Sequence, residues 1–244
     1  MIGGLEKLSL IDYPGELAAV VFTQGCNFQC PFCHNPMLVD ASSEAGKFKD
    51  NFRFSDVQEG HSLIKEDDLL VFLERRKGKL DGVVVTGGEP SLQGDLEDFL
   101  GKLKEMGYKV KLDTNGSRPE VLEKLIENKK IDYLAMDFKT SPDKYPKLSG
   151  SIGFSKMEKS VKIVMNSGLP YEFRTTLVPD IIVKDDLGKI GEQIKGAEKW
   201  FLQAFINHTS LLDNEWSKKQ PFTDKEMEEM LEVAKKYVKS AGLR

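Results

Sequence analysis

Short apolar runs alternate along the chain with longer segments in which apolar residues recur every three or four positions. The short runs are rich in β-branched and aromatic residues and predict strands over residues 18–23, 82–86, 109–114, 133–138, 172–178 and 200–206. The longer segments predict helices over residues 66–77, 96–106, 119–128, 156–166 and 186–197. Thr223 and Glu226 have the spacing of a capping box, which predicts a last helix that runs to Ser240.

Strands that alternate with helices predict a parallel sheet whose crossovers all have one hand. Six strand–helix units are too few for the closed eight-stranded barrel. We therefore expect an α/β fold, a partial (β/α)6 barrel with a C-terminal helix over residues 223–240. The pattern fits a single domain over residues 1–244 with its core at about 16–206.

The polar stretch 39–62 interrupts this pattern, and it contains three phenylalanines but no clear period. Long loops in compact domains are often lids or docking elements, so we expect one of those roles. A surface insertion with no catalytic role is the alternative.

Composition narrows the function classes. Lys and Arg number 35 against 39 Asp and Glu, a net charge of −4, which does not suggest a general nucleic-acid binder. No apolar run has the length needed to cross a membrane, and the first residues do not resemble a secretory signal. We expect a soluble cytoplasmic protein with no nucleic-acid or membrane partner.

All three cysteines, Cys26, Cys30 and Cys33, lie within eight residues in the spacing C-x-x-x-C-x-x-C. An odd number in a chain with no secretory signal argues against a disulfide framework. A structural zinc site needs a fourth ligand, and His34 is poorly placed because it adjoins Cys33. An iron–sulfur cluster fits the spacing better, since thiolates are its usual ligands, and zinc remains the alternative.

Polar residues, and glycines that expose backbone groups to a ligand, recur at or near the carboxyl ends of the later predicted strands, where parallel α/β folds gather their sites. They are Gly87, Gly88, Glu89, Asp113, Thr114, Asn115, Asp137, Lys139, Arg174 and Gln203. Strand alternation puts Asp137 and Lys139 on one face, which a surface ion pair would also explain. Arg174 lies within a strand, so we expect it to face a carboxylate or a polar interior.

The motifs C-x-x-x-C-x-x-C at 26–33 and G-G-E-P at 87–90, in this order, resemble the two signatures of the radical S-adenosylmethionine (radical SAM) superfamily. Further runs resemble the activases of glycyl radical enzymes, most of all the activating proteins of anaerobic ribonucleoside-triphosphate reductase. These runs are I-D-Y-P-G at 11–15, F-T-Q-G-C-N at 22–27, C-H-N-P at 33–36, D-T-N-G at 113–116 and M-D-F-K at 136–139. The resemblance covers about residues 1–206.

The resemblance implies two cofactors. Cys26, Cys30 and Cys33 would bind a [4Fe–4S] cluster whose open fourth iron is chelated by S-adenosylmethionine. The loop at Gly87, Gly88 and Glu89 would hold the methionine amine. The remaining cofactor-binding residues that it implies are Phe32 and His34 toward adenine, Asn35 in the loop, Asp113, Asp137 and Lys139 toward the methionine and ribose, Thr114 and Asn115 after the same strand as Asp113, and Arg174 toward the carboxylate. Relatives have a histidine where Ile206 falls here, so the sixth-strand contact would come from His208, two residues on, or from Gln203.

The implied function is that of an oxidoreductase from an anaerobic metabolism. It would cleave S-adenosylmethionine reductively to a 5′-deoxyadenosyl radical and generate a glycyl radical on a partner enzyme, expected to be anaerobic ribonucleotide reductase. A flavodoxin or ferredoxin is the implied electron donor. The alternatives are a small-molecule radical SAM enzyme similar to 7-carboxy-7-deazaguanine synthase and a zinc-stabilised binding module without catalysis.

Overall fold

The computed structural model describes residues 2–39, 63–149, 152–208 and 211–244. Its centre is an eight-stranded sheet in which the strand order β1 to β8 is also the chain order. The strands are β1 (Ile2–Ser9), β2 (Ala18–Thr23), β3 (Gly82–Gly87), β4 (Lys109–Thr114), β5 (Tyr133–Asp137), β6 (Tyr171–Leu177), β7 (Lys199–Ala204) and β8 (Ser240–Leu243). β1 runs antiparallel to β2, and all later neighbours are parallel.

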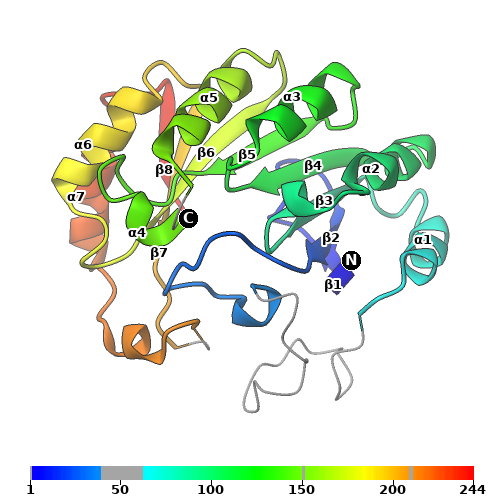
Figure 1. Cartoon of the computed structure of the whole chain (residues 1–244), viewed down its shortest axis with the longest axis horizontal. Helices are drawn as coiled ribbons and strands as arrows, with labels where there is room; N and C mark the ends of the chain where they lie inside the picture. Colours follow the sequence, from blue (N-terminus) through cyan, green and yellow to red (C-terminus); the bar gives the residue numbers. More distant parts are fainter. Residues whose placement is uncertain (1, 40–62, 150–151, 209–210) are drawn as a thin grey trace.

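Helices connect the parallel strands and follow the convex side of the curved sheet (Figure 1). They are α1 (Glu66–Glu74), α2 (Leu96–Glu105), α3 (Pro119–Glu127), the short α4 (Pro146–Ser149), α5 (Phe154–Met165), α6 (Lys184–Gln193) and α7 (Asp224–Ala234). All six predicted strands are present within two residues at each end, and each predicted helix is also found. The predicted insertion at 39–62 lies outside the described residues except for Val39.

Alternate residues along each strand face opposite sides of the sheet, because side chains repeat with a period of two. On β2, Ala19 and Val21 join the main core with the helices, whereas Val20 packs in a separate small cluster with Tyr13 and Val84. The concave side is therefore only partly apolar. It leaves room for polar side chains from the later strands.

Two strands and one helix end differ from expectation. β1 and β8 add to the six predicted strands, so the sheet has eight. The last helix was expected to reach Ser240 but ends at Ala234. The chain then turns back to β7: Gly196 N donates to Tyr237 O at 2.8 Å and Lys239 N to Ala197 O at 2.9 Å. A longer helix would leave the hydrogen-bonding edge of β7 unpaired, so Ser240 starts a strand instead.

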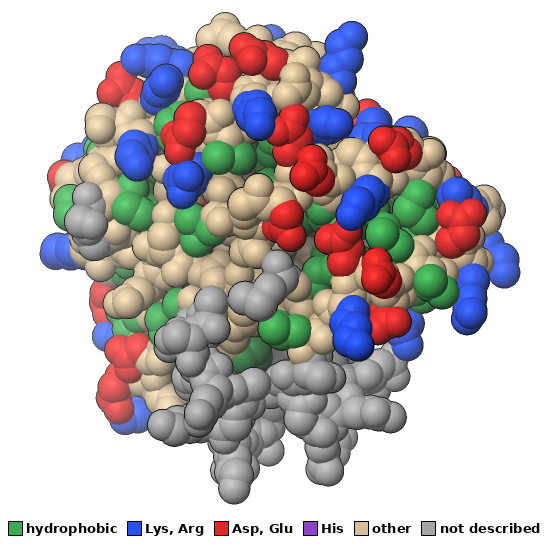
Figure 2. Space-filling view, turned by 45° about the vertical axis from the view of Figure 1, so that its right-hand side comes forward, with side chains coloured by type: hydrophobic (Ala, Val, Ile, Leu, Met, Phe, Trp, Pro, Cys, Tyr) green, Lys and Arg blue, Asp and Glu red, His purple; other side chains and the backbone are tan. Residues whose placement is uncertain are grey.

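The strand topology determines where a site can form. The carboxyl ends of the parallel strands lie at one edge, and the chain from 24 to 39 passes beside that edge (Figure 1). On the face drawn in Figure 2, basic and acidic side chains are interspersed. Among the described residues, no helix combines the length and apolar character that a membrane crossing requires.

Candidate functional site

The three cysteines lie on the loop between β2 and a short 3-10 helix at Pro36–Leu38. Two backbone bonds join the start of this loop to its end, from Gly25 N to Leu38 O at 2.7 Å and from Cys26 N to Val39 O at 3.0 Å. In the middle, Gln29 N donates to Leu148 O of α4 at 3.1 Å. The loop is thus held at its base and at its far end, so its conformation is fixed by the fold.

All three thiols are largely screened from water, and Cys30 is only 6% exposed. Burial raises the pKa of Cys26 to about 11 and that of Cys30 to about 12, and it also raises the pKa of Cys33. The Lys139 ammonium acts in the opposite direction on all three. A cationic metal centre favours the thiolate far more strongly, so these thiols suit metal binding better than free nucleophilic chemistry.

The Gly-Gly-Glu loop after β3 lies directly against the start of the cysteine loop. Gly88 N donates to Thr23 O at 2.9 Å and Glu89 N to Gly25 O at 2.8 Å. A Cβ at Gly88 would lie 2.0 Å from the Gly25 carbonyl oxygen, which no side chain allows. Gly87 has φ of +115°, a conformation that favours glycine. Glycine is required here because two backbones meet without intervening side chains.

Glu89 is 1% exposed and accepts hydrogen bonds from its own loop and from the end of β4. Its Oε1 accepts from Ser91 N at 3.1 Å, Ser91 Oγ at 2.5 Å and Thr114 Oγ1 at 2.7 Å, and its Oε2 accepts from Asn115 N at 2.7 Å. Burial raises the pKa of Glu89, and these four donors oppose the shift. The carboxylate thereby connects the ends of β3 and β4.

Asn115 continues this network to the cysteine loop. Its Nδ2 donates to Asn27 Oδ1 at 3.0 Å and lies 4.0 Å from Cys26 Sγ. Ser117 Oγ accepts from Asn27 Nδ2 at 2.9 Å. The loops after β2, β3 and β4 therefore form one hydrogen-bonded unit around the first cysteine.

A chain of alternating charges crosses the concave side of β4, β5 and β6; we call Lys111, Asp113, Arg174, Asp137 and Lys139 the buried ion chain. Arg174 Nη1 donates to Asp113 Oδ2 at 2.9 Å, and its Nε donates to Asp137 Oδ1 at 2.8 Å. Lys139 Nζ reaches Asp137 Oδ2 at 2.7 Å, and Lys111 Nζ contacts Asp113 Oδ1 at the other end. The expected carboxylate partners of Arg174 are present.

Neighbouring charges determine the pKa values of Asp137 and Lys139. Burial alone would raise the pKa of Asp137, but Arg174 and Lys139 outweigh it and hold that pKa well below its usual range. Burial likewise disfavours the charged form of Lys139, and Asp137 more than compensates, so the pKa of Lys139 is raised. Asp137 and Lys139 are therefore ionised at neutral pH and present fixed charges to the cavity that they line.

A cavity of about 380 Å³ lies between the cysteine loop and the strand ends, within the size range of small-molecule sites. The sixteen predicted site residues all line it. They are Cys26, Cys30, Phe32, Cys33, His34, Asn35, Gly87, Gly88, Glu89, Asp113, Thr114, Asn115, Asp137, Lys139, Arg174 and Gln203. Ile206 also lines it, whereas His208 is exposed. The structure thus brings the predicted residues together, and their individual roles stay predictions.

Sequence reasoning missed the deeper part of the concave side. Lys111 is 1% exposed, and Glu172, which is fully buried, accepts from Tyr133 Oη at 2.9 Å and from Arg244 at 2.7 Å and 3.0 Å. The signal was available: Lys111 precedes Asp113 by two residues, as Glu172 precedes Arg174, so each pair shares a strand face. Lys111 pairs with Asp113, which lines the cavity, and Glu172 pairs with Arg244 deeper in the sheet.

The Radical SAM superfamily model matches residues 20–187 of this chain. Over its whole length the chain is 33% identical to "Putative glycyl-radical enzyme activating enzyme MJ1227" of Methanocaldococcus jannaschii, with 95% of that protein covered. It is 32% identical over 201 residues to pyruvate formate-lyase-activating enzyme of Clostridium pasteurianum, a match that covers 80% of this chain and 76% of the relative. The chain therefore belongs to the radical SAM superfamily, in its branch of glycyl-radical enzyme activating enzymes.

Solved structures agree on the fold. SuiB of Streptococcus suis bound to S-adenosylmethionine matches 92% of this chain with a TM-score of 0.65 at 15% identity, and the chain spans about half of SuiB (49%). QueE of Escherichia coli matches with a TM-score of 0.59 at 16% identity, over 100% of this chain and 92% of QueE. Likeness at this level of identity concerns the fold alone. It confirms the expected α/β class and accords with a partial barrel.

Enzymes of this superfamily use a [4Fe–4S] cluster and S-adenosylmethionine. The residues present fit both groups. Three screened thiols line one cavity. Gly88 lines the same cavity, and its close contact with Gly25 leaves backbone groups, and no side chains, at that part of the cavity wall. The cavity also offers carboxylates and cations to a ligand that carries an amine, a carboxylate and a sulfonium. The chain is thus an enzyme of this cofactor class.

Proposed function

We propose that this protein generates the glycyl radical of an anaerobic ribonucleotide reductase. The branch to which the chain belongs acts on glycyl radical enzymes, and the reductase is our choice of partner within that group. The meeting of the cysteine loop, the Gly-Gly-Glu loop and the buried ion chain at one cavity supports the radical chemistry, and the sequence runs that resemble reductase-activating proteins support the choice of partner. When bound, the cluster supplies the electron that cleaves S-adenosylmethionine to methionine and a 5′-deoxyadenosyl radical.

The chain's own residues bind and orient. Cys26, Cys30 and Cys33 would hold the cluster, and the backbone at Gly87 and Gly88 would receive the methionine amine. Glu89 would act mainly by fixing that backbone, because both of its oxygens already accept hydrogen bonds from protein donors.

The ion chain would receive the charged parts of S-adenosylmethionine. Arg174 uses Nε and Nη1 on the two aspartates, so Nη2 is the atom we assign to the ligand carboxylate. Lys139 is the member of this ion chain whose charge lowers the pKa of all three cysteines. Gln203, near the end of β7, lines the same cavity and would also contact the ligand. A flavodoxin or ferredoxin would supply the electron.

The test is electron paramagnetic resonance on the anaerobically reconstituted protein, reduced and given S-adenosylmethionine. It is mixed in parallel with an anaerobic ribonucleotide reductase and with a pyruvate formate-lyase from the same host. We expect a glycyl doublet with the reductase that requires all components. A doublet with the lyase alone would overturn the choice of partner, and no doublet with either would overturn the activase role.

Cys30→Ala serves as the control for the chemistry. This variant should lose the intact cluster and with it the release of 5′-deoxyadenosine. Continued release at the wild-type rate would show that the cysteine loop is not the cofactor site.

A further inference from the structure

A further acidic side chain lies on the concave side of the sheet, beside the arginine of the buried ion chain. Glu172 precedes Arg174 by two residues on β6, so both side chains project from the same face of the strand. In the strand register, Glu172 lies opposite Ala135, and Ala135 lies opposite Asp113. The residue between the two acids in this row is thus only an alanine, and Arg174 has a third carboxylate next to the two that it binds.

Arg174 nevertheless pairs with the aspartates. Within the described residues, its ion pairs are those with Asp113 at 2.9 Å and with Asp137 at 2.8 Å. Burial disfavours the charged form of Arg174, but the charges of Asp113 and Asp137, and then that of Glu172, raise its pKa. Glu172 therefore attracts Arg174 without binding it, so something else must satisfy this carboxylate.

Arg244 is the main partner of Glu172, which is completely buried. Arg244 Nη1 donates to Oε1 at 2.7 Å, and its Nη2 donates to Oε2 at 3.0 Å. Tyr133 Oη adds a single bond to Oε2 at 2.9 Å. A two-point contact between guanidinium and carboxylate is among the strongest hydrogen-bonded pairs in proteins. Both oxygens of Glu172 are thereby occupied.

The position of Arg244 is fixed by β7, on which it lies directly after β8. Its N donates to Leu202 O at 2.9 Å, and its O accepts from Ala204 N at 3.0 Å. Its guanidinium carbon is 3.6 Å from the centroid of the Phe201 ring. Gly242 lies opposite Phe201, and a Cβ there would come within 3.2 Å of that ring. Backbone pairing and a stacked ring therefore aim the guanidinium at Glu172.

We propose that Arg244 is a positioning residue for Arg174. By occupying both oxygens of Glu172, it leaves Nη2 of Arg174 directed at the ligand carboxylate. The inference rests on the proposed function, in which Arg174 binds that carboxylate of S-adenosylmethionine. Without Arg244, Glu172 would be a buried carboxylate with one donor, and the cation on its own strand is Arg174. The Arg174 guanidinium would then turn toward Glu172 and away from the cavity.

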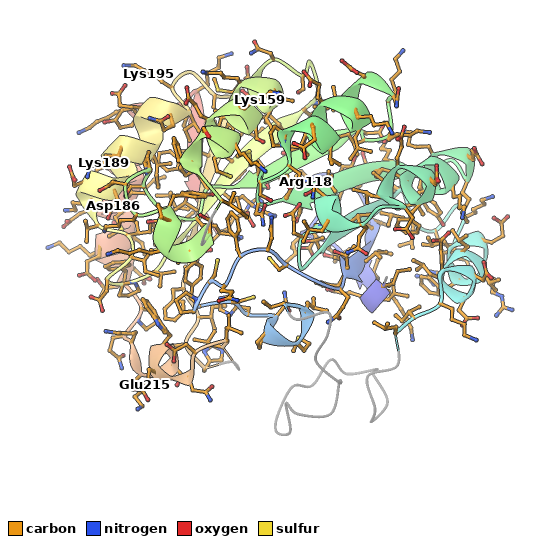
Figure 3. The ribbon with its side chains drawn as sticks, viewed as in Figure 1. Arg118, Lys159, Asp186, Lys189, Lys195 and Glu215 are labelled. Carbon is orange, nitrogen blue, oxygen red and sulfur yellow. The ribbon has the colours of Figure 1, made fainter. Side chains whose placement is uncertain are left out.

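The test compares three variants with the wild type. Arg244→Met keeps an unbranched apolar stem over Phe201 and removes the guanidinium. Glu172→Gln removes the competing charge, and the double variant combines both changes. Arg118→Met is the matched control: Arg118, labelled in Figure 3, also donates to a glutamate, Glu120, at 2.6 Å, but this pair is exposed and does not line the cavity.

Each protein is reconstituted anaerobically with its cluster and checked for folding by circular dichroism. Its equilibrium affinity for S-adenosylmethionine is then measured by isothermal titration calorimetry. Arg244→Met should bind about tenfold more weakly or worse, the loss expected when one hydrogen bond between charged groups is broken. Arg118→Met should keep the wild-type affinity.

Recovery in the double variant is the signature of the proposed role. Both Glu172→Gln and the double variant should bind within about threefold of the wild type, because a neutral amide competes much less for a guanidinium than a carboxylate does. If Arg244 served only to hold β8 in place, changing Glu172 could not restore the affinity.

Two results would overturn the inference. One is a wild-type affinity in Arg244→Met, and the other is a double variant that binds as weakly as Arg244→Met. If Arg244→Met does not fold, Arg244→Lys replaces it; its single-point contact should lower the affinity by about threefold, again with recovery when Glu172 is also changed. A wild-type protein that does not bind S-adenosylmethionine would instead overturn the proposed function, so the two failures are distinguishable.

Discussion

The buried ion chain gives a prediction in which environment, not distance, decides the energy. Lys139 and Asp137 are 2.7 Å apart, and Lys162 and Glu158 on the surface of α5 are also 2.7 Å apart. The first pair is 23% and 22% exposed, and the second is 70% and 48% exposed. If distance alone mattered, neutralising either acid would cost the same.

We expect Asp137→Asn to destabilise the cluster-free protein by about 3 kcal/mol, the low end for a broken buried pair because water still reaches about a fifth of the side chain. The substitution leaves Arg174 with one carboxylate and Lys139 with none. Glu158→Gln should cost at most about 0.5 kcal/mol, since exposed helical pairs contribute little.

The pH dependence provides the second signature. Asp137 has a folded-state pKa held below the value of about 3.9 expected in the unfolded chain. Its contribution is therefore complete above that unfolded value and is lost as pH falls through the folded pKa. The gap between wild type and Asp137→Asn should be constant from pH 7 to 5 and should narrow below pH 4.

Urea-induced unfolding of both variants at a series of pH values measures these differences. An Asp137→Asn variant within 1 kcal/mol of the wild type at pH 7, or a gap that widens on acidification, would refute the reasoning.

Two further predictions concern the loop after β3. Gly88→Ala puts a Cβ 2.0 Å from the Gly25 carbonyl oxygen and should cost about 1–3 kcal/mol and disturb cluster uptake; Gly94→Ala, which meets nothing within 4 Å, should change stability by less than about 0.5 kcal/mol in the same urea titration. Glu89→Gln places an amide donor opposite the Asn115 backbone N–H and should cost about 1–3 kcal/mol by thermal unfolding, and a variant as stable as the wild type would mean that the loop does not depend on this acceptor.

Strand periodicity predicted most of the sheet because the six inner strands are apolar runs bounded by glycine or polar residues. β1 escaped because its sequence I-G-G-L-E-K-L-S mixes glycine and charge, and it relies on pairing with β2 for its conformation. β8 has only four residues and follows a strong helical pattern without a break. In both cases hydrogen bonding to the neighbouring strand, and not the local sequence, determines the strand conformation.

The gathering of the candidate site residues at one cavity was predictable, because these residues follow strand ends and parallel strands end together. How deeply each of these side chains is buried was not predictable in the same way. Lys109 and Lys111 share a strand face, yet Lys109 is exposed and Lys111 is buried, since the face runs from the rim into the interior.

The identity of strand order and chain order has a consequence for how the cavity is built during synthesis. Each new strand pairs with the one made just before it, so β2 to β5 can associate without waiting for distant segments. Asp113 on β4 and Asp137 on β5 each pair with a lysine that precedes β6 in the chain, Lys111 and Lys139. Arg174 comes with β6 and joins the two pairs. We therefore expect the ion chain, and with it the wall of the cavity, to be completed only when β6 has joined the sheet.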